Sequence, residues 1–265
     1  MIKALFFDID GTLVSFHTHR IPTSTIQALK EAKARGVKLF IATGRPQVII
    51  NNLQALQQQG LIDGYITMNG AYCFVEDEVV YKSPIPKNDI KALLHFCEAQ
   101  GKACIVVGEK DICVCNEDEE VRFIFYETLN VDKIREVTRE EVLAMPDIYQ
   151  ITPFINQEEE ALIKPQLPHC EIGRWYPTFA DITANGNTKQ RGIDEIIRHF
   201  GLKIDEVMAF GDGGNDIPML RHAGIGVAMG NATDEVKAAA NYTTTAVDED
   251  GILNALVHFG VIEHV

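Results

Sequence analysis

The chain has 265 residues, a length that suits one α/β domain or two smaller ones, with 38 acidic and 24 basic side chains and a formal net charge of −14. This charge excludes a dominant basic surface, and with it sequence-independent binding to nucleic acid or to anionic membranes. Because no stretch reaches the roughly 20 apolar residues of a membrane span, we expect a cytoplasmic protein.

An alternation of strands and helices is expected from the first residues onward. Residues 3–7 form a short apolar run that ends at carboxylates, which indicates a buried strand followed by a loop. A helix is expected over residues 22–36, then a strand at 37–42, a helix reaching Gln59, and a strand at 65–68. This alternation predicts a parallel, doubly wound sheet.

The pattern changes in the middle of the chain. Residues 71–75 and 79–82 flank an acidic turn and predict a hairpin. From residue 84 onward, helices are mixed with alternating runs, which indicates an antiparallel α+β module. Helices are expected at 88–100 and 117–129, and strands at 103–107, 111–115, 148–154, 171–175 and 179–183.

Regular alternation returns after residue 184. The expected elements are a helix reaching residue 200, strands at 207–210 and 225–229 with a helix between them, and helices at 234–240 and from 251. The sequence therefore predicts an α/β fold, with a doubly wound, Rossmann-like core and an inserted α+β domain. We expect the core to comprise residues 1–83 and 184–265, and the inserted domain residues 84–183.

Two carboxylates follow the first predicted strand directly. Asp8 and Asp10 stand at its carboxyl end, which is where open α/β sheets place their ligands. Gly11 then permits a sharp turn, so that the backbone can approach a ligand closely.

A second acidic loop follows the strand at 207–210. Residues 211–216 read Gly-Asp-Gly-Gly-Asn-Asp, a composition that favours a loop folded tightly around an ion or a phosphate. The carboxylates of Asp212 and Asp216 are hard oxygen ligands, which select Mg²⁺ or Ca²⁺ over zinc.

Positive and hydrogen-bonding groups come from two further places. Thr43 and Gly44 form the turn after the second strand, and Lys189 lies in the first turn of a predicted helix. A hydroxyl, free backbone N–H groups and an ammonium group are what phosphoryl oxygens require.

In this order and placement, the four motifs resemble those of the haloacid dehalogenase superfamily. More narrowly, the chain resembles its type IIB-capped, Cof-like sugar-phosphate phosphatases, on the strength of Asp-Ile-Asp-Gly-Thr, Ala-Thr-Gly-Arg, the helix-start lysine and Gly-Asp-Gly-Gly-Asn-Asp. The resemblance implies a phosphatase in which Asp8 is the nucleophile and forms an aspartyl phosphate, and Asp10 is the general acid and base.

The resemblance also implies a cofactor and its ligands. Thr43, Gly44 and Lys189 would bind the transferring phosphoryl group. Mg²⁺ would be held by Asp8, by the backbone carbonyl of Asp10 and by Asp212. Asn215 would orient this shell, and Asp216 would bind the metal either directly or through water.

Recognition of the leaving group is expected from both domains. The candidate residues, which combine arginine side chains with amide and aromatic groups, are Arg45, Asn69, Arg174, Trp175 and Tyr176. The expected partner is a small phosphorylated metabolite, with hexose or pentose phosphates ahead of nucleotides or phosphoproteins. We expect a monomer or a weak homodimer.

Two alternatives stay open at this stage. A sugar phosphomutase of the same superfamily would share all four motifs. A catalytically silent metabolite-binding protein would be expected to lack Asp8 or Asp10, and both are present.

Overall fold

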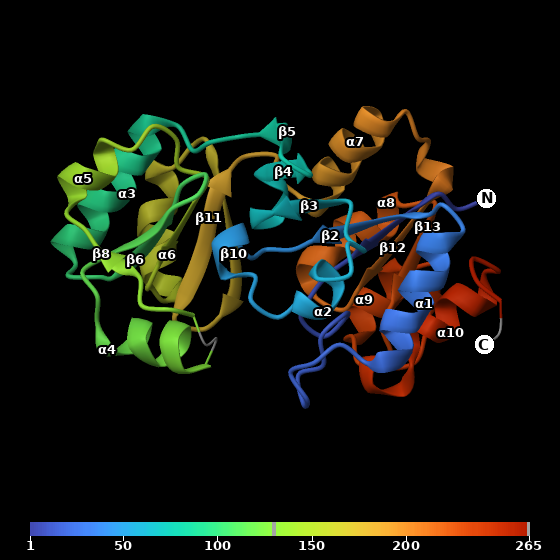
Figure 1. The fold of residues 1–265 in the computed structure, drawn as a ribbon. Helices are drawn as coiled ribbons and strands as arrows, with labels where there is room; N and C mark the ends of the chain where they lie inside the picture. Colours follow the sequence, from blue (N-terminus) through green and yellow to red (C-terminus); the bar gives the residue numbers. More distant parts are fainter. Residues whose placement is uncertain (129–130, 264–265) are drawn as a thin grey trace. The chain divides into compact units, whose positions relative to one another are not determined.

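The computed structural model of the protein describes residues 1–128 and 131–263, without the side chain of Trp175. Within these residues the chain forms two compact units, each built around its own sheet (Figure 1). The first comprises Met1–Arg45, Ile50–Tyr81 and Thr188–Val265, and the second Pro46–Ile49 and Lys82–Asn187. No helix in the described ranges has the length and apolar character needed to cross a bilayer.

The first unit contains a largely parallel sheet. In spatial order its strands are β14 (Tyr242–Thr243), β13 (Ile225–Ala228), β12 (Val207–Gly211), β1 (Ala4–Phe7), β2 (Lys38–Ala42), β3 (Gly64–Thr67), β4 (Tyr72–Val75) and β5 (Glu78–Lys82). The strands from β14 to β3 are parallel, and β4 turns back antiparallel to β3. The expected fold class, a parallel-sheet α/β core with a second α+β unit, is confirmed.

Both faces of this sheet are buried, because successive side chains of a strand point to opposite sides. Phe7 stacks on Phe210 on one face, and Phe6 stacks on Phe40 on the other, each pair with ring centroids 4.8 Å apart. The first face is covered by α1 (Thr23–Ala34), α2 (Gln54–Gln57) and α10 (Gly251–His258), and the second by α7 (Lys189–Phe200), α8 (Ile217–His222) and α9 (Asp234–Ala239).

The second unit has a mixed sheet and its own apolar core. Its strands are, in spatial order, β10 (Cys170–Tyr176), β11 (Phe179–Ala184), β9 (Gln150–Pro153), β6 (Cys104–Val107), β7 (Ile112–Cys115) and β8 (Arg135–Glu136). Its helices are α3 (Lys87–Ala99), α4 (Glu119–Val121), α5 (Arg139–Leu143) and α6 (Gln157–Ile163). All described strand pairs are antiparallel except β7 with β8.

One predicted helix is wrong in extent, and a second has close to the predicted extent but is mostly not α-helical. The helix expected up to Gln59 is reduced to a 3₁₀ turn, Gln47–Ile49, and to the single turn of α2. Asn51 and Asn52 separate the two, and asparagine competes with helical backbone bonds. The helix expected at 117–129 begins as α4 and continues as a π-helix, Arg122–Thr128. Residue 129 lies outside the described residues.

Close packing of α7 on the sheet generates a stability prediction. A Cβ placed on Gly192 would lie 2.3 Å from Cγ2 of the buried Ile66 in β3. We therefore expect Gly192→Ala to lower the free energy of unfolding by about 1–3 kcal/mol, the usual cost of an extra methyl group in a packed interior. Urea denaturation measures this change. Lys30→Ala, at an exposed position of α1, is the control and should change it by less than about 0.5 kcal/mol.

Candidate active site

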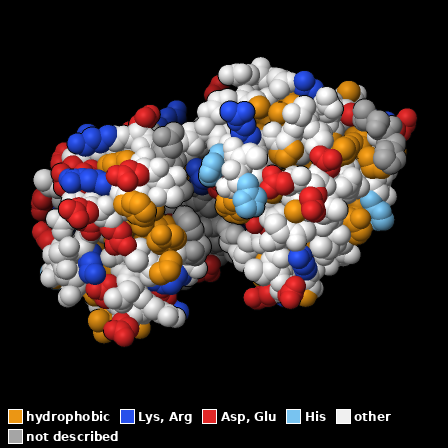
Figure 2. Space-filling model, turned by 90° about the horizontal axis from the view of Figure 1, so that it is seen from below, with side chains coloured by type: hydrophobic (Ala, Val, Ile, Leu, Met, Phe, Trp, Pro, Cys, Tyr) orange, Lys and Arg blue, Asp and Glu red, His pale blue; other side chains and the backbone are white. Residues whose placement is uncertain are grey.

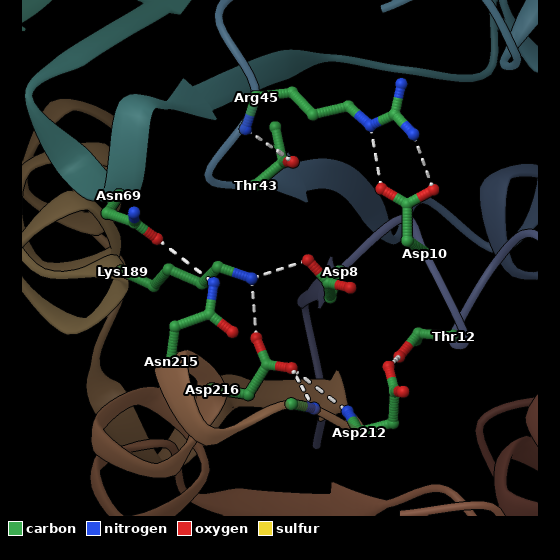
Figure 3. Close-up of polar contacts among 11 residues, drawn as sticks. Asp8, Asp10, Thr12, Thr43, Arg45, Asn69, Lys189, Asp212, Asn215 and Asp216 are labelled. Atoms are coloured by element: carbon green, nitrogen blue, oxygen red, sulfur yellow. Dashed lines mark hydrogen bonds and ion pairs between the residues drawn. The ribbon is translucent and has the colours of Figure 1, made fainter. Parts of the chain in front are cut away.

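Polar segments that are far apart in the sequence meet at one edge of the parallel sheet (Figure 3). Asp8 follows β1, Thr43 follows β2, and Asp212 follows β12. These three strands are parallel neighbours, so their carboxyl ends lie at the same edge. Lys189 reaches the same place from the first residue of α7. The four predicted motifs thus converge in the first unit.

The amino group of Lys189 lies between two carboxylates. Its Nζ is 2.5 Å from Oδ1 of Asp8 and 2.6 Å from Oδ1 of Asp216. The side chains of Lys189 and Asp216 are fully buried, and that of Asp8 is 13% exposed. Charges so far removed from water require close partners, so the three groups form one ionic unit.

This ionic unit contains two carboxylates and only one ammonium group, so negative charge is in excess. Burial alone lowers the pKa of Lys189, but Asp216 and Asp8 more than offset this, so the pKa is raised overall and the ammonium stays protonated. Burial raises the pKa of Asp8 well above its ordinary value, against the opposing effect of Lys189. The charges of Asp216 and Asp212 raise it further. A cation beside Asp8 would relieve this repulsion.

The acidic loop after β12 is held by its own last residue. Oδ2 of Asp216 accepts the backbone N–H groups of Asp212, at 3.0 Å, and Gly213, at 2.9 Å. Oδ1 of Asp212 accepts the hydroxyl of Thr12 at 2.8 Å, and Nδ2 of Asn231 lies 3.4 Å from its Oδ2. Burial raises the pKa of Asp212 to about 6, while the bond from Thr12 acts in the opposite direction.

Thr12 and Asn231 were not among the predicted site residues. Each nevertheless carries a signal in the sequence. Thr12 closes the first motif, and Asn231 follows β13 at the same edge of the sheet. A polar residue just after a parallel strand is therefore a candidate even where no known motif includes it.

The donor set fits a magnesium ion. Asp8, Asp212 and Asp216 each offer a carboxylate oxygen, and the three oxygens lie within 4.8 Å of one another. Carboxylate oxygens are the ligands that Mg²⁺ prefers. Both oxygens of Asp216 already accept bonds from Lys189 and from the loop. Asp8 pairs with Lys189 through Oδ1, which leaves its Oδ2 for a cation.

Asp10 is paired with Arg45. Nε of Arg45 is 2.7 Å from Oδ2 of Asp10, and Nη2 is 2.9 Å from Oδ1, so the pair is bidentate. Arg45 was predicted as a leaving-group contact, and its pairing with the second carboxylate was not anticipated. Oγ1 of Thr43 accepts the backbone N–H of Arg45 at 3.0 Å, which leaves the hydroxyl proton of Thr43 to donate to a ligand.

Asn69, Gly44 and Asn215 meet at the other side of the Thr43 turn. Nδ2 of Asn215 donates to Oδ1 of Asn69 at 3.1 Å. A Cβ on Gly44 would lie 3.2 Å from Nδ2 of Asn69, so the glycine leaves room for this amide. The structure thus places Asn69 beside the predicted phosphate-binding turn.

The remaining candidates belong to the second unit. Nε of Arg174 donates to Glu160 at 2.8 Å, and its Nη1 donates to backbone carbonyls, among them those of Ile155 and Pro177 at 3.0 Å. The guanidinium of Arg174 thus joins segments within the second unit. Tyr176 is 38% exposed and stacks on Phe179 with ring centroids 5.2 Å apart. The side chain of Trp175 lies outside what the structure describes.

Comparisons with known proteins find a matching family model and related sequences over nearly the whole chain. The family model described as haloacid dehalogenase-like hydrolase matches residues 5–256. YkrA of Bacillus subtilis strain 168, which carries the name of a phosphatase, is 33% identical over 261 residues, or 98% of this chain and 99% of that protein.

Solved structures are similar over nearly the whole chain. The haloacid dehalogenase subclass IIB sugar phosphatase BT4131 is 63% identical, with a TM-score of 0.92 over 98% of this chain and 100% of that one. The phosphatase BT1666 from Bacteroides thetaiotaomicron is 37% identical, with a TM-score of 0.89 over 99% of this chain and 96% of that one.

The excess of negative charge predicts that magnesium stabilises the protein more at neutral than at acid pH. Asp212 has a pKa of about 6 in the folded protein and about 4 in an unfolded chain. The folded state therefore holds this proton more tightly, and the metal-free protein loses stability as the pH rises from about 4 to about 6.

Bound Mg²⁺ offsets this loss of stability, and it binds better once the carboxyl group of Asp212 is ionised. Millimolar Mg²⁺ should therefore raise the midpoint of thermal unfolding by several degrees near pH 7.5, and by much less near pH 5. Asp212→Asn should reduce the difference, and the remainder belongs to Asp8, whose pKa burial also raises. Equal shifts at the two pH values in the unsubstituted protein would contradict the prediction.

Proposed function

The chain belongs to the haloacid dehalogenase-like hydrolase family and is a phosphatase of that family, and we propose that it hydrolyses small phosphate monoesters, above all hexose and pentose phosphates. One observation carries the proposal: Asp8 is buried at the carboxyl edge of the sheet between Lys189 and the acidic loop, with Asp10 two residues away. The 63% identity to the sugar phosphatase BT4131 supports the substrate class.

Asp8 is the nucleophile in this mechanism. One of its carboxylate oxygens forms a bond to phosphorus as the bond from phosphorus to the leaving oxygen breaks, which yields an aspartyl phosphate. The ammonium of Lys189 opposes the effect of burial and favours the ionised form of Asp8. Lys189, the Thr43 hydroxyl and the backbone N–H of Gly44 bind the phosphoryl oxygens, where negative charge is concentrated during transfer.

Asp10 moves the protons. It donates one to the departing oxygen and then accepts one from the water molecule that cleaves the aspartyl phosphate. The bidentate pair with Arg45 orients the Asp10 carboxyl group. We therefore assign Arg45 to the positioning of Asp10, in addition to any contact that it makes with substrate.

The acidic cluster would hold Mg²⁺ through the carboxylates of Asp8 and Asp212 and the backbone carbonyl of Asp10. Asp216, both of whose oxygens are already engaged, would act on the loop or through a water molecule, and Asn215 would orient the same shell. When bound, the ion supplies positive charge that reduces repulsion between Asp8 and the anionic phosphate.

Leaving-group recognition is assigned mainly to the second unit. Tyr176 is the strongest candidate there, because its ring is partly exposed and braced by Phe179. Arg174 binds carbonyl groups of its own unit, so its contribution would be to shape the strand that carries Trp175 and Tyr176. Small phosphorylated metabolites are the expected partners.

The two alternatives from the sequence make different demands. A phosphomutase would convert a hexose phosphate to its isomer faster than it releases inorganic phosphate, so product analysis separates it from a hydrolase. A silent binding protein needs neither an intact Asp8 nor Asp10, whereas both are present here and each is held by a basic partner.

The nucleophile assignment is tested by Asp8→Asn. An amide is a poor nucleophile, so phosphate release from p-nitrophenyl phosphate and from glucose 6-phosphate should fall below detection, while the unsubstituted protein releases phosphate from both and requires Mg²⁺. Thermal unfolding measured alongside ensures that the variant is folded. Residual turnover within about tenfold of the original would remove Asp8 from the nucleophile role.

The division of labour between the two units is tested by comparing Asp10→Asn with Tyr176→Ala. Asp10→Asn should lower kcat about 10²–10⁴-fold on sugar phosphates, and less on an aryl phosphate whose leaving group needs no proton. Tyr176→Ala should raise KM for sugar phosphates about three- to tenfold, as expected for loss of one aromatic contact. The KM for the aryl phosphate should stay unchanged. If Tyr176→Ala impairs both substrates equally, recognition does not reside in this side chain.

A further inference from the structure

The turn between β3 and β4, Met68–Gly70, has an unusual backbone. Met68 and Asn69 have φ angles of 49° and 52°, and Gly70 follows with 96°. Three successive residues are thus left-handed, although two of them carry a Cβ. Such conformations are strained, and they persist only where the surrounding contacts hold the backbone in place. This occurs most often at functional sites.

The backbone of this turn donates hydrogen bonds to the backbone of the Thr43 loop. The N–H of Asn69 donates to the carbonyl of Thr43 at 3.0 Å, and the N–H of Met68 donates to the carbonyl of Arg45 at 3.3 Å. The two bonds bracket Gly44, whose Cα faces the Asn69 amide at close range. The strained conformation therefore directs successive N–H groups at the segment proposed to bind phosphate.

The same turn also contacts the segments that carry Lys189 and Asn215. A Cβ on Gly70 would lie 2.2 Å from the backbone oxygen of Thr188, so the turn lies directly against the N-cap of α7. Oδ1 of Asn69 accepts the amide of Asn215 from the acidic loop. Three of the four catalytic segments thus touch one turn of three residues.

We infer that the Met68–Gly70 turn is a fifth element of the active site, and that Asn69 is a positioning residue that sets the Thr43 loop against the acidic loop. The inference deepens the proposed function and rests on it. The side-chain oxygen of Asn69 is already taken by Asn215, and its amide nitrogen faces Gly44, so the side chain is used within the site. This favours positioning over the leaving-group contact expected from the sequence.

Asn69→Gly separates positioning from stability. Glycine adopts left-handed angles without steric cost, so the substitution relieves strain in the turn while deleting the amide. We expect kcat to fall about tenfold or more on both p-nitrophenyl phosphate and glucose 6-phosphate, with each KM within about twofold, because small misplacements of catalytic groups are costly. The midpoint of thermal unfolding should stay at or above that of the unsubstituted protein.

Glu76→Gly is the matched control. Glu76 has the same φ angle of 52°, at the exposed turn between β4 and β5, and no role in the site. It should gain or keep stability and retain full kcat. A fall in kcat for this variant equal to that of Asn69→Gly would show that relief of strain in this hairpin region, and not the amide, is responsible, and would overturn the inference.

The contact with Asn215 is tested by a double-mutant cycle. If Asn69 and Asn215 act through their mutual bond, Asn69→Gly combined with Asn215→Ala should be no more than about twofold slower than the slower single variant. Multiplicative losses would overturn the shared role. Unchanged kcat in Asn69→Gly, or a rise in KM confined to the sugar phosphate, would also overturn positioning by Asn69. Lack of any phosphatase activity in the unsubstituted protein would instead refute the proposed function.

Discussion

The buried ammonium group of Lys189 is the constraint on which the rest of the first unit depends. It joins the end of β1, the start of α7 and the loop after β12, because its two carboxylate partners belong to the first and last of these. Removal of one member of a buried ionic group costs about 3–5 kcal/mol, since the remaining charge is left unpaired. Stability and chemistry therefore rest on the same atoms, and the site cannot loosen without weakening the fold around it.

The positive charge that attracts an anionic substrate must come from groups within the site itself. The whole chain carries a formal charge of −14, so its long-range field repels an anionic substrate. Within the site, four carboxylates from Asp8, Asp10, Asp212 and Asp216 face the two cationic groups of Lys189 and Arg45. A divalent cation brings this set to balance. Hydroxyl and backbone donors can then bind phosphate without adding further mobile charge.

The sequence predicted the parts of the site that depend on strand ends, and it did not predict the pairings between loops. Asp8, Thr43 and Asp212 could be found because each follows a recognisable apolar run and carries a suitable functional group. The Arg45–Asp10 pair and the Thr12–Asp212 bond join residues 35 and 200 positions apart, and no periodicity encodes the direction of such side chains. The direction of the Arg174 side chain could not be predicted either, because residue type alone does not reveal that its guanidinium donates to carbonyl groups of its own unit.

The pairing of β1 with β12 has a consequence for how the protein is made. Ala4 lies opposite Val207, so the central strand of the sheet lacks one neighbour until some 200 further residues have been synthesised. At the usual rate of translation this takes roughly 10–40 s, during which β1 can pair only with strands from its own side. Residues 82–187, which form most of the second unit, are complete before then. The loop that carries Asp8, the proposed nucleophile, is therefore synthesised well before Lys189 and the acidic loop with which it forms the site.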